Sequence, residues 1–441
     1  MNIKKLAILL LTALWLFLLT SNFITSFRHT SPKADLDRKA LLANFFLELQ
    51  ELNQLQTFDK KQTLKGQLLA SALDLYSKPN ASNSLQLCLI RLAQDKNEEA
   101  LKILALNKTQ KDRKTIQLLD SLINRKHLPY SLEFSDTILK ENFSGWFLYK
   151  AQTLLYRQTK QTKKSEDLFT DFQNRVTKRF YFLLWTSFWI IAGMVLGIVT
   201  LGIYLGFFSR FREIWANPGW DWLNAWGLFI ATYLLKDFLY LLIYPRTPIP
   251  DISRLFIVYL IANTLFLGLI FYFVLVSNRL SLNDLGFRFG NWKKQILLGL
   301  SGYWAAIPTV FCMALLSQWL LKLPSFSSNP VIEMVLKTRN QTDILLLFLM
   351  LGIIGPFCEE ILFRGFLYPT FRKKLGIGWG IFITALIFSL LHSDPAGIIP
   401  ILGLGMVLNF LYESTGSILP GFIAHSLWNI SVFFFLTRLF G

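Results

Sequence analysis

The residues best suited to chemistry lie late in the chain, where ionisable side chains interrupt long apolar segments. Two adjacent carboxylates, Glu359 and Glu360, are followed by Arg364. On an α-helix, residues four apart share a face, so Arg364 would neutralise Glu360 and leave Glu359, about 100° away, as the free acid. Unequal surroundings separate the pKa values of two such acids, which allows one to act as a general base. The alternative is a salt bridge that only anchors a helix end at the membrane surface.

Two further polar sets follow on the next apolar segments. Phe388-Ser389-Leu390-Leu391-His392 ends in an imidazole, and His425 and Asn429 are four residues apart on the last segment. An imidazole and a carboxamide on one helix face can both donate hydrogen bonds to a developing oxyanion. Each histidine alone could be a packing residue. Together, three membrane helices that each contribute inward-facing polar groups predict a site inside a bundle.

The order of these motifs resembles a known family. Glu-Glu-x-x-x-Arg at 359–364, Phe-x-x-x-His at 388–392 and His-x-x-x-Asn at 425–429 are complete here and stand in this order on successive helices. The sequence is similar to the CAAX-protease and bacteriocin-processing family of membrane proteins, related to the Rce1-type prenyl proteases. Asn283-Asp284-Leu285-Gly286-Phe287 also resembles the connection that precedes the core of that family.

The resemblance implies an intramembrane endopeptidase and a role for each residue. Glu359, with His392, would position and deprotonate a water that attacks the scissile carbonyl, while His425 and Asn429 would hold the oxyanion. Glu360 and Arg364 would support the base, although the two adjacent acids could exchange roles. The implied substrate is a membrane-associated protein or peptide, and no cofactor is expected.

Four other functions compete with this interpretation. Zinc could bind two histidines and a glutamate, but the chain has no His-Glu-x-x-His, which disfavours a metalloprotease. Gly299-Leu300-Ser301-Gly302 matches the nucleophile loop of rhomboid-like serine proteases, although Gly and Ser are common packing residues in membrane helices. A transporter or proton relay could use the same acids and histidines, and a membrane scaffold would use none of them.

The elements that must position these residues are membrane helices. The chain of 441 residues is 53% hydrophobic, and stretches long enough to cross a bilayer carry almost no charge. The net charge of +17 does not indicate nucleic-acid binding, because many Lys and Arg residues flank apolar segments and fit the positive-inside rule. About eight spans are predicted by length and hydropathy, at 180–207, 222–244, 254–276, 295–321, 343–370, 376–392, 397–413 and 418–438.

The region before these spans has a different character. Residues 1–27 carry a basic flank and an apolar run without a small-residue cleavage site, which favours an uncleaved signal anchor. Residues 28–178 are polar and helical, with two short helices expected over Leu85–Leu104. Within Gly145–Phe169, Trp146, Tyr149, Ala151 and Tyr156 have offsets that fit a degenerate tetratricopeptide repeat and an irregular bundle equally well.

The predicted fold is therefore an all-α polytopic membrane helix bundle. It comprises the anchor, an extramembrane helical domain at 28–178 and an intramembrane protease domain at 179–441. With the N-terminus inside, the basic clusters after alternate spans are cytoplasmic and the 28–178 domain lies outside, in a plasma membrane of bacterial type or an internal membrane. The expected contacts are the lipid bilayer, the substrate and a protein partner for the 28–178 domain.

Overall fold

The computed structural model describes the parts of the chain that position the candidate residues. The described residues are 8, 12, 43, 47, 48, 84–94, 96–105, 113–207, 218–243, 251–321, 334, 335, 338, 340–392 and 394–440. The predicted signal anchor therefore lies outside them apart from Ile8 and Thr12. Within this described part every regular element is helical, which confirms the all-α prediction.

The chain divides into two compact units. One, called the helical unit below, covers Thr30–Trp185, and the other, called the membrane unit, combines Met1–His29 with Thr186–Gly441. The predicted division at residues 28 and 178 lies close to these limits. The helix α10, Thr162–Phe207, contributes residues to both.

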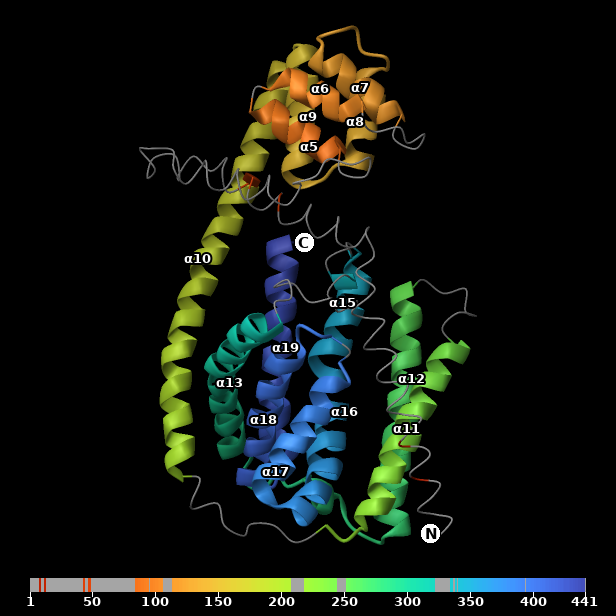
Figure 1. Cartoon of the computed structure of the whole chain (residues 1–441), viewed down its shortest axis with the longest axis vertical. Helices are drawn as coiled ribbons and strands as arrows, with labels where there is room; N and C mark the ends of the chain where they lie inside the picture. The colour runs from red at the N-terminus through yellow and green to blue at the C-terminus, as the bar shows by residue number, and fades with distance from the viewer. Residues whose placement is uncertain are drawn as a thin grey trace. The chain divides into compact units, whose positions relative to one another are not determined.

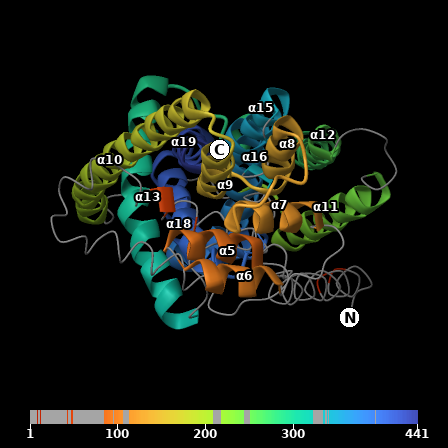
Figure 2. The ribbon, with the colours of Figure 1, turned by 90° about the horizontal axis from the view of Figure 1, so that it is seen from above.

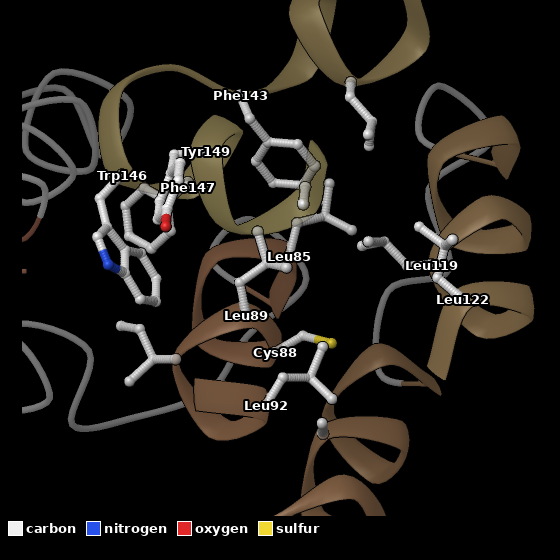
Figure 3. Close-up of a cluster of buried hydrophobic side chains, with 14 of the residues drawn as sticks. Leu85, Cys88, Leu89, Leu92, Leu119, Leu122, Phe143, Trp146, Phe147 and Tyr149 are labelled. Carbon is white, nitrogen blue, oxygen red and sulfur yellow. The ribbon is translucent and has the colours of Figure 1, made fainter. Parts of the chain in front are cut away.

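The helical unit is held together by a core of leucines and aromatic side chains (Figure 3). Trp146 and Leu89 are fully buried, and the rings of Tyr149 and Phe172 stack with their centroids 3.8 Å apart. Two short helices occur over Leu85–Leu104, as predicted. The helices are α5 (Ser84–Ala93), α6 (Asn97–Ala105), α7 (Arg113–Ile123), α8 (Leu132–Asn142), α9 (Gly145–Gln158) and the first part of α10.

The membrane unit is a bundle of long apolar helices (Figure 1). α18 packs against both α13 and α17, and α19 packs against α13, so these four helices form its tightest part. Gly405 on α18 allows this approach, since a Cβ there would lie 3.0 Å from the Cβ of Ala385 on α17. The helices are α11 (Trp222–Ile243), α12 (Asp251–Phe271), α13 (Trp292–Leu321), α15 (Gln341–Leu349), α16 (Gly355–Glu359), α17 (Tyr368–Leu390), α18 (Ile398–Thr415) and α19 (Ile418–Phe440).

The described part of the membrane unit also contains three short π-helical segments and one 3₁₀ turn. A π-helix adds a residue to a turn and often marks a functional position. Two of these segments lie around the Glu pair, in the stretch that joins α15 to α17. The segments are η4 (Tyr272–Ser277), η6 (Met350–Ile354) and η7 (Glu360–Leu367), and the 3₁₀ turn is η5 (Leu282–Leu285).

Six helices in the described residues are long and apolar enough to cross a membrane, which supports a multi-pass membrane protein. They differ from the expected spans at two places. Residues 343–370 and 376–392 form one helical stretch, Gln341–Leu390, that is interrupted where Gly376 leaves the helix with φ 80°. The expected span at 222–244 is α11, which is not among the six. The six are Thr162–Tyr204, Ile252–Ser277, Trp292–Leu321, Gln341–Leu390, Ile398–Thr415 and Ile418–Arg438.

Candidate active site

The Glu pair lies at the junction of α16 and η7, deep in the membrane unit. The Arg364 guanidinium donates a hydrogen bond to Glu360 Oε1 at 2.9 Å, and both side chains are fully buried. A salt bridge that anchors a helix end at the membrane surface would keep its charged groups near water. The complete burial of this pair therefore argues against the anchoring alternative.

Glu360 is held from a second side by α19. His425 Nδ1 lies 3.0 Å from Glu360 Oε1, and His425 is 2% exposed. An ionised carboxylate can only accept hydrogen bonds, so Nδ1 carries the hydrogen and Nε2 is left for another partner. That second nitrogen lies 3.8 Å from Glu359 Oε2, which places His425 between the two acids. Sequence reasoning assigned His425 to the oxyanion and did not anticipate these contacts.

The space for Glu360 is created by a glycine. A Cβ on Gly421, which lies on α19 one turn before His425, would collide with Glu360 Oε2. Glu360 could not move aside without losing Arg364 or His425, because its other oxygen bonds to both. Gly421 is therefore part of the site, although nothing in its sequence context indicates that role.

Glu359 has different surroundings. Its side chain is 33% exposed, and it lines a pocket whose walls come from α11, α12, α16 and η7. Figure 1 shows the paired helices α11 and α12, which supply most of this wall. The carboxylate that the helical spacing leaves free is thus the one that meets open space. The lining residues are Tyr233, Lys236, Tyr259, Asn263, Phe266, Cys358, Glu359 and Leu362.

Phe388, the first residue of Phe-x-x-x-His, connects the three motifs. The Arg364 guanidinium lies over its ring, 4.7 Å from the centroid. The rings of His392 and His425 meet it edge to face, with centroids 4.7 Å and 5.7 Å away. Because the aromatic face attracts the cation and the histidine rings pack at an angle to it, Phe388 fixes their relative positions.

The other two predicted residues contact the backbone. His392 Nδ1 lies 2.8 Å from the Phe388 carbonyl oxygen, so this nitrogen donates and Nε2 remains an acceptor. Asn429 donates to the Leu351 carbonyl oxygen at 2.9 Å, which ties α19 to η6. The structure therefore brings Glu359, Glu360, Arg364 and His425 into contact, while no hydrogen bond or ion pair in the described residues joins His392 or Asn429 to the acids.

The competing motifs have ordinary surroundings in the described residues. The Ser301 hydroxyl lies 2.6 Å from the Tyr204 hydroxyl and also bonds to the Leu298 carbonyl, so its partners are those of a packing residue. No group of three or more His, Cys, Asp or Glu side chains in this part of the chain is arranged to hold a metal ion.

One residue of the pocket was not among the site residues predicted from the sequence. Lys236 lies in the expected span 222–244, and a cation inside an apolar span is a functional candidate on energetic grounds. That signal is present in the sequence, as Lys236-Asp237 between Leu235 and Phe238. The sequence gives no such signal for Tyr259 and Asn263, because their position in the pocket wall depends on how α12 packs.

Comparisons with known proteins agree with the motifs. The model of the family "Type II CAAX prenyl endopeptidase Rce1-like" matches residues 341–431. A protein of Bacillus subtilis (strain 168) named "Putative membrane peptidase YdiL" is 27% identical over 139 residues, which cover 31% of this chain and 56% of that protein. The chain thus spans just over half the length of this relative. No solved structure gives a significant match. The resemblance predicted from the three motifs is confirmed: residues 341–431 match the Rce1-like family model, and the relative is named as a putative membrane peptidase.

Proposed function

We propose that this protein is an intramembrane endopeptidase in which Glu359 activates a water molecule. The observation that carries the proposal is the unequal setting of the two acids. Glu360 is fully buried and bonds to Arg364 and His425 through one oxygen, whereas Glu359 is 33% exposed and lines a pocket. A general base must reach its water and must not be neutralised by a permanent partner.

The proposed reaction uses the chain's own side chains. Glu359, helped by the free Nε2 of His392, takes a proton from water while the water oxygen bonds to the scissile carbonyl carbon. The carbonyl oxygen becomes an oxyanion that accepts the second amide hydrogen of Asn429 and a hydrogen bond from His425 Nε2. For this role His425 must carry a hydrogen on both ring nitrogens, because Nδ1 already donates to Glu360. Glu359 then passes the proton to the leaving amine as the carbon–nitrogen bond breaks. Arg364 and Glu360 keep His425 in position.

The substrate in this proposal is a membrane-associated protein or peptide. The pocket is walled by apolar helices of the membrane unit, which favours a ligand that reaches it from the bilayer or its surface, and the family model is named for prenyl endopeptidases. We further propose that the helical unit lies outside the cytoplasm and holds a protein partner or the substrate. The basic clusters after alternate spans support that orientation.

The test compares the protein termini in native membranes of cells that produce the wild-type chain or Glu359→Gln. General-base catalysis contributes about 10²- to 10⁴-fold, so new termini should be generated by the wild type and lost in the variant. Their full retention in Glu359→Gln would overturn the mechanism. A chelator arm completes the experiment: cleavage should persist with chelator, and its loss would reassign the water to a metal ion.

A further inference from the structure

Lys236 is a charged side chain in the apolar helix α11. It lies seven residues before Ile243, the last described residue of the helix, which is roughly 10 Å along the axis. Cations within membrane helices are costly and face a bundle interior or a cavity. Lys236 follows this rule, since it lines the same pocket as Glu359.

The Lys236 ammonium forms no ion pair in the described residues, and its charge also attracts the carboxylate of Asp237. Lys236 Nζ lies 5.2 Å from the centroid of the Tyr233 ring, and no carboxylate in this part of the chain comes within 4.0 Å of it. Asp237, the next residue, belongs to a neighbouring face of the helix and does not line the pocket. Lys236 and Glu359 therefore line the same pocket without forming an ion pair.

The rest of the pocket wall combines polar and apolar groups. Tyr233 and Tyr259 have hydroxyl groups, and the side chain of Asn263 bonds to both the carbonyl and the side chain of Tyr259. Phe266 and Leu362 supply apolar surface. A substrate whose scissile carbonyl lies at Glu359 would extend along this wall towards Lys236.

We propose that Lys236 is a substrate-binding residue that takes a carboxylate of the peptide, close to the bond that is cleaved. The inference rests on the proposed function. A cation in a partly desolvated pocket gains most from an anion that enters with the ligand, because charge-assisted hydrogen bonds strengthen as water is excluded. The carboxylate could be the terminal carboxylate of the peptide or an Asp or Glu side chain, and the experiment separates these sources.

The experiment measures binding and does not require cleavage. The full chain carrying Glu359→Gln is placed in phosphatidylcholine nanodiscs and exposed to three acylated, photoreactive peptides of otherwise equal composition. One has a free terminal carboxylate and Gln, the second a terminal amide and Glu, and the third a terminal amide and Gln. Labelling of α11 and α12 by a carboxylate probe should exceed that by the neutral probe about tenfold to a hundredfold, as expected for a charged hydrogen bond.

Variants of Lys236 assign that preference to the side chain. In Lys236→Met, labelling by the carboxylate probes should fall to about the level of the neutral probe. Lys236→Arg, which restores the charge, should recover most of the preference for the carboxylate probes. Lys293→Met is the matched control, since Lys293 also lies near an aromatic ring, 5.6 Å from that of Trp292, but is outside the pocket. The control should retain the full preference.

Three results would overturn the inference: equal labelling by all probes, no labelling of the pocket helices, or a preference that survives in Lys236→Met. None of them depends on proteolysis, so a failure here is separate from a failure of Glu359 as the base. Whichever carboxylate probe labels more strongly identifies the source of the anion.

Discussion

The two sides of the Glu pair differ in what surrounds them, and in the proposed mechanism this difference separates the supporting acid from the base. On the inner side, Glu360, Arg364 and His425 are buried and bound to one another, with Gly421 leaving room for the carboxylate. On the outer side, Glu359 is one-third exposed and meets a pocket. Neighbouring residues of one type can therefore have distinct tasks, because the packing of α19 and α12 decides which of them sees water.

Removing the cation of the inner side should have the largest effect on stability. Arg364→Met leaves Glu360 buried without its main counter-ion, and breaking a buried pair in this way costs about 3–5 kcal/mol. The loss should appear as a lower melting temperature of the purified protein in detergent. Arg438→Met is the matched control, since Arg438 is exposed near the end of α19, and it should change the melting temperature little.

The double variant Glu360→Gln/Arg364→Met sharpens this prediction. Because both charges are removed, it should recover part of the stability that the single variant loses. Equal melting temperatures for Arg364→Met and Arg438→Met would show that the inner side is not a supporting ion pair.

Filling the space beside Glu360 should have a smaller effect. In Gly421→Ala the new methyl group meets a carboxylate that is fixed by two partners, and overpacking of this kind costs about 1–3 kcal/mol. Gly268→Ala is the control, because a Cβ there has nothing within 4 Å. Thermal unfolding of the two variants checks the prediction, and a Gly421→Ala protein as stable as the control would contradict the proposed packing.

The smallest loss of stability is expected at Asp136, a carboxylate of the helical unit, which serves as the reference for the buried acids. Partial burial alone would raise the pKa of Asp136, but hydrogen bonds from Lys140, Gln152 and Tyr156 outweigh it and lower that pKa below its ordinary value. The stability that this ionised group contributes is therefore present above its unfolded pKa of about 3.9 and is lost as the pH falls through the lower, folded value.

Asp136→Asn should cost less than about 1 kcal/mol at pH 7, because the site is partly exposed and water replaces lost partners. In denaturant titrations, the difference in unfolding free energy between Asp136→Asn and the wild type should become smaller below pH 4. Asp120→Asn, at an exposed surface pair with Lys126, is the control. If Asp136→Asn lost as much stability as Arg364→Met, the distinction between a fully buried ion pair and a partly exposed one would not hold.

Local spacing predicted the parts of the site that one helix determines. The i, i+4 relation placed Arg364 on Glu360 and left Glu359 free, and hydropathy placed the apolar helices that carry the motifs. The prediction assumed an α-helix at this point. The π-helical segment η7 keeps residues four apart on one face, so the Glu360–Arg364 contact survives.

Relations between helices were beyond the sequence. The contact of His425 with Glu360, the space left by Gly421 and the bond from Asn429 to Leu351 all depend on how α19 packs against η6 and η7. No local pattern encodes such packing. The charge of Lys236 was visible in the sequence, but only the pocket relates it to Glu359.

The most direct test compares Glu359→Gln with Glu360→Gln in one preparation, measuring both the formation of cleaved termini and the melting temperature. We predict that Glu359→Gln melts like the wild type but generates no cleaved termini, because it loses the base while the amide can still contact His425 Nε2, which lies 3.8 Å from Glu359 Oε2. Glu360→Gln should melt at a lower temperature, because it loses the partner of Arg364 and His425. Undiminished cleavage by Glu359→Gln would contradict the assignment of Glu359 as the base that faces the pocket.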